Sequence, residues 1–589
     1  MHPSALMKLL ILLGFLATGP GLNGARKETW FEVKSPHFMA YSNAGESEAR
    51  NVLKGFEGIR SVFQQAFPGL RVDPPKPMVV LVLENEAIMK RFLPGEFEGK
   101  DPARPAGYFI SAADRNYAIL RLDVDHQIDQ PYFVLFHEYT HSIVHQNFAA
   151  MPTWLDEGIA DFYGATEIRS DQVFLGRIPM GRLATLRESA RLPLPTLLTV
   201  THDSPHYREG EKTGMFYAQS WALVHYLFMD EQARKAGLFQ AYLKVLGGAV
   251  DPLAAARSGL GDLEKLQKDL GAYSRRSVFT FWKLPLAIKL TEKDFQTRPL
   301  TVAEALVVAA EFLQTSRNEA ASRSLLEQAL ALAPQQPEVQ MALGYGHFIR
   351  GEKEQARGAF ETSIQMGSKD FRAPYYLALL AQEHFASGEA ETDRILGWLK
   401  SAQGLRPDFP GIHMALCRQY SWNPKNPTES LREGRLAIEA EPQNFANRAN
   451  FGQACMNLDL EKEARLIGAE LQRTAANKGE RQIADSYGKI LIQFLERRKA
   501  QAVLPTEPPP VPDPSQPQAG PDLPRLRFSL PSYLAPLGTE VMRLVGVGAL
   551  EEAIQKVEKA IVQAHYAYDK KALRTLLATL RARRVGKHP

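Results

Sequence analysis

The sequence predicts an α+β domain followed by an all-α array of helices, and two observations predict this fold class. Between residues 29 and 289, short runs of β-branched and aromatic residues are mixed with helical stretches. From Leu300 to about Arg498, alanine and leucine recur at helical spacing without strand signals. A chain of 589 residues is also too long for a single hydrophobic core, so several domains are expected.

Composition and charge exclude some classes of partner. Hydrophobic residues make up 45% of the chain and charged residues 23%, which is ordinary for a globular protein. A formal net charge of +4 on this length gives no general reason to expect binding to nucleic acid or to an anionic membrane. Beyond the N-terminus no segment approaches the length of a membrane span, so we expect no stable membrane insertion.

The first residues have the layout of a secretory signal peptide. Lys8 precedes an apolar run from Leu9 to Ala17, and small and turn-forming residues follow as far as Ala25. The apolar run is too short to span a membrane. We therefore predict a signal peptide at residues 1–25 and an exported protein, either periplasmic or extracellular. The rest divides into an α+β domain (26–295), helical repeats (300–498), a proline-rich linker (499–526) and a C-terminal helical segment (527–589).

The elements of the α+β domain follow from hydrophobic periodicity and turn residues. The last two of the expected strands form a hairpin around Asp114–Asn116, and the strands are Trp30–Val33, His37–Tyr41, Met78–Leu83, Tyr108–Ser111 and Tyr117–Leu122. The expected helices are Glu46–Phe67, Pro131–Asn147, a second one from Pro152 through Tyr163, and Met215–Phe228. Helical patterns continue from Lys235 to Leu270, with breaks at Gly247–Gly248 and Gly259.

One stretch carries residues suited to metal chemistry. His137-Glu138-Tyr139-Thr140-His141 reads H-E-x-x-H. Positions i and i+4 of a helix share one face, so His137 and His141 can bind one zinc ion, with Glu138 beside them to handle a proton. A catalytic zinc needs a third protein ligand. The candidates are Glu157, Asp161, His145 and Asp156, with Glu157 the best of them; a third histidine at metzincin spacing fails because the chain has Val144 and Asn147.

The pairing of this motif with Trp154-Leu155-Asp156-Glu157-Gly158-Ile159-Ala160-Asp161 resembles the gluzincin peptidases. The resemblance implies a zincin-like metallopeptidase domain with one zinc ion per chain, held by His137, His141 and Glu157. It also implies that Asp161, one helical turn after Glu157, orients the first histidine. Asp156 stands where asparagine is common in that group. More narrowly, the order of sheet, motif and later helix resembles the peptidase-MA-like domains of exported bacterial proteins.

The resemblance also implies a mechanism and a mode of substrate binding. Glu138 is expected to be the general base for hydrolysis of a peptide bond in a peptide or protein substrate. Tyr217 is the candidate that stabilises the oxyanion, and His206, Tyr207 and His225 are its rivals. The strand Tyr117–Leu122 is expected to be the sheet edge that pairs with extended substrate.

The helical region resembles four or five divergent tetratricopeptide repeats. Pro407 and Pro442 are 35 residues apart, close to the repeat length of about 34, and Gly344 and Ala356 match small positions of the family. An all-α tetratricopeptide solenoid is therefore expected, with a protein partner bound through it. Cys417 and Cys455 either form a disulfide or remain two buried thiols. Leu504–Pro524 is expected to be an extended linker, with a last helix pair from Leu537 to Leu580.

Three hypotheses follow. The main one is an exported zinc metallopeptidase whose repeats recruit substrates or partners. The alternative is a tetratricopeptide scaffold with a non-catalytic zinc domain. A zinc-dependent amidase that acts on cell-wall material would use the same residues.

Overall fold

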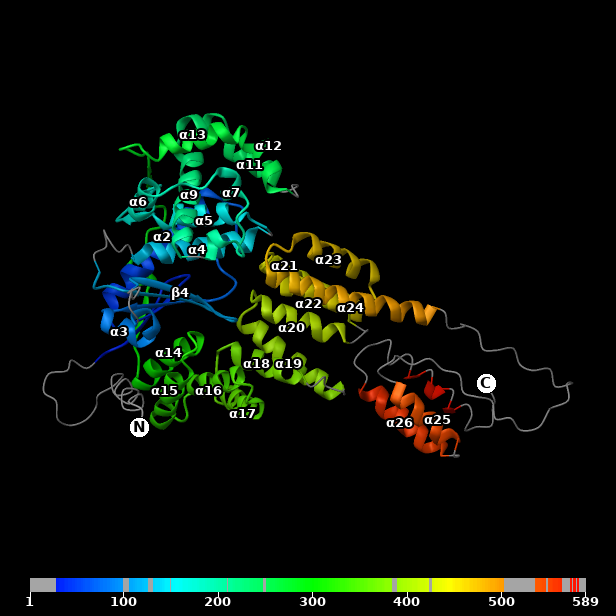
Figure 1. The fold of residues 1–589 in the computed structure, drawn as a ribbon. Helices are drawn as coiled ribbons and strands as arrows, with labels where there is room; N and C mark the ends of the chain where they lie inside the picture. The colour runs from blue at the N-terminus through cyan, green and yellow to red at the C-terminus, as the bar shows by residue number, and fades with distance from the viewer. Residues whose placement is uncertain are drawn as a thin grey trace, which may run out of the picture. The chain divides into compact units, whose positions relative to one another are not determined.

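A computed structural model describes residues 28–98, 105–124, 131–148, 150–208, 210–246, 251–383, 389–422, 426–502, 535–546, 549–563 and parts of 573–581. The chain forms two compact units, Met1–Ala373 with Ala440–Gln443, and Pro374–Glu439 with Asn444–Pro589 (Figure 1). The predicted signal peptide (1–25) and the proline-rich stretch 504–524 lie outside the described residues. The described part of the chain is mostly helical, with a small α/β region near its beginning.

The first unit is built around a six-stranded sheet of order β4-β5-β3-β2-β1-β9. Its strands are β1 (Phe31–Lys34), β2 (Met39–Ser42), β3 (Met78–Leu83), β4 (Gly107–Ser111), β5 (Asn116–Arg121) and β9 (Gln296–Pro299). β3 pairs in parallel with both β2 and β5, and the other neighbours pair antiparallel. All six residues of β3 are buried, which explains its unbroken apolar sequence. The predicted strands and the β4–β5 hairpin are confirmed.

The predicted edge strand is wrong. Tyr117–Leu122 corresponds to β5, which lies between β4 and β3 and is buried along its whole length. The sheet edge on this side is β4. The reason is that β3 is buried on both faces and has a partner on each side, so the second strand of the hairpin pairs with it and displaces the first strand to the outside.

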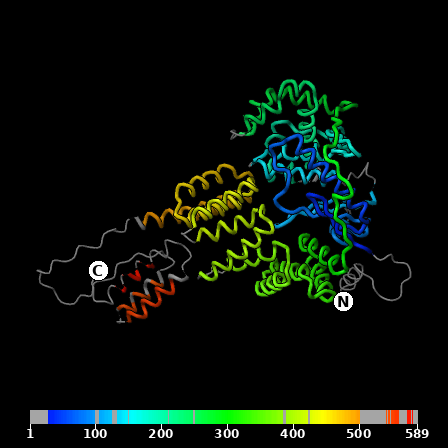
Figure 2. The backbone as a smooth tube through the Cα atoms, turned by 180° about the vertical axis from the view of Figure 1, so that it is seen from behind, coloured from blue at the N-terminus to red at the C-terminus, as the bar shows by residue number. Residues whose placement is uncertain are grey.

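Helices cover both faces of the sheet (Figures 1 and 2). On one face, Val80 and Val82 join a core with helices α2 (Glu46–Ala66) and α4 (Pro131–Asn147). On the other face, Val79 and Leu81 join a core with α3 (Glu86–Phe92) and α14 (Val302–Thr315). This alternation is the period of two that a strand imposes. The helix α14, the first of the predicted repeat region, therefore completes the core of the sheet.

The ring of Phe312 shows how closely α14 fits. Its centroid lies 5.4 Å from that of Phe92 on α3 and 5.5 Å from that of Tyr117 on β5, edge-on in both cases. Edge-to-face contacts of this kind add about 0.5–1.5 kcal/mol to the stabilisation from burial.

A buried ion cluster also joins α14 to the sheet. Glu311 on α14 accepts hydrogen bonds from Arg115, in the β4–β5 turn, at 3.0 Å, and from Arg372 at 2.6 Å. Arg372 is also bonded to Asp370, and its side chain is only 4% exposed. All four residues belong to the first unit.

Between α4 and β9 the chain forms the second motif helix, α5, and the α-helices and strands that follow it. They are α5 (Thr153–Gly164), β6 (Glu167–Arg169), β7 (Gln172–Leu175), α6 (Met180–Glu188), α7 (Leu194–Leu198), α8 (Pro205–Arg208), α9 (Gly210–Met229), α10 (Glu231–Lys235), α11 (Leu238–Leu246), α12 (Pro252–Leu260), α13 (Leu263–Tyr273) and β8 (Trp282–Pro285). The predicted break at Gly259 is wrong, because this residue lies inside α12, where a Cβ would approach Cα of Tyr242 to 2.4 Å. The helix ends at Gly261, whose φ is +81°. Gly247–Gly248 lies outside the described residues.

The repeat region is all helical, as the sequence predicted, and several consecutive helices pack against each other. These are α14 with α15 (Glu319–Leu332), α16 (Pro337–Ile349) with α17 (Lys353–Gln365), α19 (Glu389–Leu405) with α20 (Pro410–Ser421), and α23 (Glu461–Thr474) with both α22 (Phe445–Asn457) and α24 (Lys478–Ala502). The region also contains α18 (Arg372–Glu383) and α21 (Pro427–Ala440). Cys417 and Cys455 are free thiols, both buried. A last pair, α25 (Ala535–Gly546) and α26 (Leu550–Gln563), has its own small core. Within the described residues, we find no helix with the length and apolar character needed to cross a bilayer.

The ion cluster leads to a prediction about stability. Replacing Glu311 by alanine leaves Arg115 and Arg372 buried without their shared carboxylate, so we expect unfolding of the first unit to become easier by about 3–5 kcal/mol. Urea unfolding followed by circular dichroism measures this loss. Glu354→Ala is the matched control, since this helical glutamate is 82% exposed and its loss should change stability by about 0.5 kcal/mol or less. Equal effects of the two substitutions would contradict the role of the cluster.

Candidate metal centre

The site is formed where α4 and α5 pack against each other, and two glycines of α5 allow close approach. A Cβ at Gly158 would lie 2.5 Å from the carbonyl oxygen of Ser220 on α9, and one at Gly164 would lie 3.0 Å from the carbonyl oxygen of Phe133 on α4. The first contact lets α5 approach α9, and the second lets it approach α4. The sequence motif contains Gly158, but its packing role is visible only in the structure.

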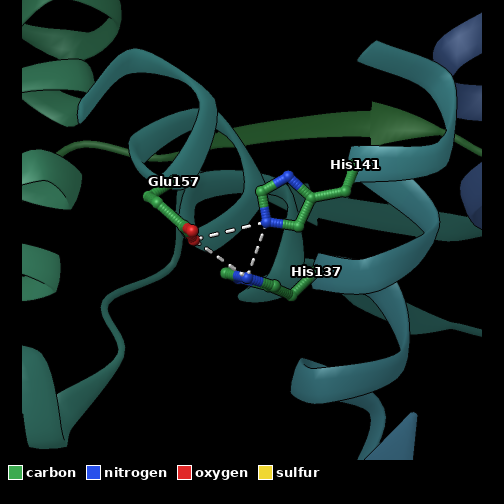
Figure 3. Close-up of side chains that lie close together, drawn as sticks. All are labelled: His137, His141 and Glu157. Atoms are coloured by element: carbon green, nitrogen blue, oxygen red, sulfur yellow. Dashed lines mark hydrogen bonds and ion pairs between the residues drawn. The ribbon is translucent and has the colours of Figure 1, made fainter. Parts of the chain in front are cut away.

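Three acceptor atoms converge between the two helices (Figure 3). Nε2 of His137 lies 3.0 Å from Nε2 of His141, and Oε2 of Glu157 lies 3.3 Å from both nitrogens. Zinc bonds of about 2.0–2.1 Å in tetrahedral geometry would separate neighbouring ligand atoms by about 3.3 Å. The triangle therefore has the size that one zinc ion requires of three ligands.

Carboxylates fix the orientation of both imidazoles. Nδ1 of His137 lies 2.9 Å from Oδ1 of Asp161, and Nδ1 of His141 lies 3.0 Å from Oδ1 of Asp156. An ionised carboxylate only accepts hydrogen bonds, so each Nδ1 carries the proton that it donates. In a neutral imidazole the lone pair is then on Nε2, where it faces the centre of the triangle. This is the arrangement in which histidines bind a metal.

The electrostatics of the three side chains also favour a positive charge at their centre. Burial lowers the pKa of His141, but Asp156 and Glu157 outweigh burial and hold that pKa well above its ordinary value. Burial raises the pKa of the Glu157 carboxyl, but the two histidines outweigh it and hold this pKa below its ordinary range. A metal ion or a proton can supply the charge.

The other candidates for a third ligand point elsewhere. Asp161 and Asp156 are turned toward Nδ1 atoms, on the sides of the rings away from the triangle. Nε2 of His145 lies 2.8 Å from Oδ2 of Asp156, so this half-exposed histidine supports the acid that orients His141. Of the four candidates, only Glu157 directs an oxygen at both Nε2 atoms.

Glu138 lies beside the triangle on α4. Its side chain is half-buried. Among the residues that the structure describes, none forms a hydrogen bond or an ion pair with its carboxylate. Both oxygens are therefore available to accept a proton or a hydrogen bond from a ligand.

Two tyrosines contact the other oxygen of Glu157. The hydroxyl of Tyr207 on α8 donates to Oε1 at 2.9 Å, and that of Tyr217 on α9 donates to it at 3.3 Å. Burial raises the pKa of both tyrosines, and the charge of Glu157 raises it further, so both hydroxyls stay protonated near neutral pH. The structure thus places Tyr207 at least as close to the site as Tyr217.

The remaining rivals of Tyr217 differ in their surroundings. His225 is fully buried, and its ring contacts the hydroxyl of Tyr273 and the carbonyl of Gly176, so it lies in the core and not at the triangle. Burial lowers its pKa to about 4. His206 precedes Tyr207 on α8, and its buried Nδ1 has no hydrogen-bond partner among the described residues.

Sequence reasoning missed Arg182, on α6. Its Nε donates to Oδ2 of Asp161 at 2.7 Å, and its guanidinium lies 4.8 Å from the ring centroid of Tyr217. Arg182 thus neutralises the acid that orients His137 and contacts a candidate catalytic tyrosine. No motif or periodicity in the sequence signals this residue.

The comparisons with known proteins assign no activity. A family model described as a protein of unknown function (DUF1570) matches residues 134–245, which include the triangle, Arg182 and both tyrosines. None of the curated proteins matches the chain.

The solved structures that match include tetratricopeptide proteins. YrrB, a TPR protein with an unusual peptide-binding site, is 15% identical, covering 32% of this chain and 92% of its own, with a TM-score of 0.26. TTC0263, a TPR protein of Thermus thermophilus, is 16% identical, covering 32% and 99%, with a TM-score of 0.27. A tetratricopeptide repeat protein of Parabacteroides merdae is 13% identical, covering 47% and 98%, with a TM-score of 0.26. TM-scores this low do not establish a shared fold. The evidence for helical repeats is the packing of the helices in the structure itself.

The packing of α5 leads to a prediction. Gly158→Ala places a methyl group against the backbone of Ser220, which cannot rotate away, so we expect a loss of about 1–3 kcal/mol. Gly181→Ala is the matched control, because its Cβ would meet nothing within 4 Å and alanine favours a helix by about 0.5–1 kcal/mol. The melting temperature should fall for Gly158→Ala and rise for Gly181→Ala. A stable Gly158→Ala variant would contradict the close packing.

The raised pKa of His141 leads to a second prediction. In zinc-free protein, the folded state holds a proton that the unfolded state releases near pH 6.5. The resulting stability is fully present below about pH 6.5 and is lost as pH rises through the folded pKa. We therefore expect the melting temperature in EDTA to fall above this pH, and zinc to cancel the fall.

The control is Asp156→Asn, which removes a carboxylate that raises the pKa of His141. The fall in melting temperature in EDTA should be smaller in this variant. The same pH dependence with and without zinc would contradict a shared site for proton and metal.

Proposed function

We propose that this chain is a zinc-dependent metallopeptidase of the gluzincin type. The observation that carries the proposal is the triangle of His137 Nε2, His141 Nε2 and Glu157 Oε2, whose 3.0 and 3.3 Å sides suit tetrahedral zinc. Three protein ligands leave one zinc position for water or substrate, as in catalytic sites. The second observation in favour is that the two imidazoles are held by Asp161 and Asp156 through Nδ1.

The zinc ion supplies Lewis-acid chemistry, since it lowers the pKa of a water molecule and polarises a carbonyl group. Glu138 accepts the proton of the attacking water and then delivers it to the leaving amine. Its free carboxylate, next to a zinc ligand on the same helix, suits this role. General acid–base catalysis of this kind contributes about 100-fold to 10,000-fold to the rate.

A tyrosine hydroxyl stabilises the oxyanion of the tetrahedral intermediate. Tyr207 and Tyr217 are both suitable, because their raised pKa values keep the donating proton in place. Tyr207 has the shorter bond to Glu157, at 2.9 Å. We assign the role to this pair of residues and not to Tyr217 alone.

The helical repeats recruit protein partners or substrates to this centre. Stacked helix pairs offer an extended surface of the kind that binds polypeptides. We also propose that the protein is exported, on the basis of the signal-peptide pattern in residues 1–25.

Substitutions at the site test the proposal. Glu138→Gln should keep about one zinc ion per chain, because the residue is not a ligand, but lose about 100-fold to 10,000-fold in peptide hydrolysis. Glu157→Ala and His137→Ala should lose most of the bound zinc. Zinc content by mass spectrometry and cleavage of a peptide library measure these outcomes.

The matched control is His347→Ala, which removes a histidine of α16 and should leave zinc content and hydrolysis unchanged. Full hydrolysis by Glu138→Gln would refute the role of the base. Zinc bound by the wild type without any cleavage would favour a scaffold with a non-catalytic zinc domain.

A further inference from the structure

A large cavity of the first unit lies next to the metal centre. Its volume is about 1410 Å³, above the roughly 300–1,000 Å³ of small-molecule pockets. Parts of the chain that the proposed chemistry does not use form most of its wall, namely α2, β6, the residues on either side of β7 (170–171 and 176–178) and the segment 277–290. Phe133 lies between the cavity and the site, since it lines the cavity and its ring centroid lies 6.1 Å from that of His137.

The rim of the cavity is apolar and open to solvent. Met180 is 64% exposed, Val278 is 83% exposed and Phe281 is 40% exposed, and all three line the cavity. Deeper in the wall are the aromatic rings of Tyr132 and Phe133. Large apolar side chains gathered around a hollow mark a binding surface, whereas scattered ones do not.

One wall of the cavity is a strand at the edge of a sheet. All three residues of β6, Glu167, Ile168 and Arg169, line the cavity. β6 is an outer strand of the three-stranded sheet β6-β7-β8. The outer side of such a strand offers backbone groups with which an extended polypeptide can pair.

The charges of the wall favour an anionic group. Glu167 and Asp171 are outnumbered by the cationic side chains that line the cavity, which are Lys54, Arg169, Arg177, Arg187 and Lys289. Glu167 is already paired with Arg169 and Arg177, and Lys54 is paired with Glu292, which lies outside the cavity. Within the described ranges, Lys289 forms no ion pair, and Arg187 donates to backbone carbonyls and not to a carboxylate.

We propose that this cavity binds an extended apolar stretch of polypeptide that carries a carboxylate. The proposal rests on the proposed function in one respect, because the bound stretch belongs to the substrate whose scissile bond lies at the metal centre. The size of the cavity, its edge strand and its apolar rim select an extended apolar chain. Its excess of cationic side chains selects the acidic group.

Binding of a dansyl-labelled Leu-Phe-Leu-Leu tetrapeptide with a free carboxylate tests this proposal. The measurement uses the full chain with Glu138→Gln, which prevents cleavage, in zinc and in EDTA. Val278→Asp and Met180→Asp should each weaken binding about tenfold, through lost apolar contact and added negative charge. Both residues are exposed, so neither change should prevent folding. The tetrapeptide amide and a Gln-Ser-Gln-Ser probe should bind more weakly than the first peptide.

Ile492→Asp is the matched control, since this apolar residue of α24 is 58% exposed and far along the chain from the cavity. It should change the dissociation constant less than twofold. Equal binding by the rim variants and the parent would overturn the proposal. Displacement of the probe by laurate together with equal affinity for the acid and the amide would overturn it in favour of a lipid.

Cleavage assays separate this proposal from the peptidase proposal. If the rim variants weaken binding in EDTA while the wild type cleaves no peptide, the cavity proposal stands and the peptidase proposal fails. If the wild type cleaves peptides and the rim variants leave both binding and KM unchanged, the cavity proposal fails alone.

Discussion

Three atoms that can accept hydrogen bonds meet in this protein, and their need for a positive charge between them is the constraint on which the surrounding contacts depend. Nε2 of His137, Nε2 of His141 and Oε2 of Glu157 lie within 3.3 Å of one another. Because both Nδ1 atoms donate to aspartates, the lone pairs of the two rings face each other and the carboxylate when both rings are neutral. Such an arrangement is repulsive unless a metal ion or a proton lies at its centre. Close packing at Gly158 and Gly164 fixes the position of α5 relative to α9 and α4, and so the position of Glu157.

The buried acids of the site are satisfied on both oxygens. Asp161 contacts His137 through Oδ1 and Arg182 through Oδ2, and Asp156 contacts His141 through Oδ1 and His145 through Oδ2. Glu157 directs Oε2 at the histidines and Oε1 at two tyrosines. A buried carboxylate is costly unless it is paired, so each of these partners lowers the cost of keeping the acid charged. Glu138 differs from them, because its carboxylate has no partner among the described residues, and its proposed role as general base needs that freedom.

Local sequence signals predict the helices of the site. They do not predict contacts between side chains of elements that are separated along the chain. Pro131 and the apolar spacing placed α4, and the second motif placed Glu157 on α5. Arg182 could not be found in this way, because two strands and a turn separate it from Asp161. The hairpin pattern of β4 and β5 likewise does not reveal which of the two strands pairs with β3. The sequence therefore predicts β5 as the edge strand, whereas the edge strand is β4. The contact of Asp156 with Nδ1 of His141 could not be predicted either, because the spacing of residues along a helix does not give the direction of a side chain.

The position of the candidate metal centre depends on a helix that the sequence assigns to a different domain. The sheet presents apolar residues on both faces, so it needs cover on both. α14 provides part of the second cover, and Glu311 and Phe312 fasten it to the β4–β5 turn and to β5. On the first face the same strands support α4, whose buried Tyr139 packs in that core and donates a hydrogen bond to the carbonyl of Val72. Tyr139 lies between His137 and His141 in the chain. Loosening α14 would therefore disturb the sheet that supports the helix of the two histidines, which makes the first repeat helix part of the unit that holds the candidate metal centre.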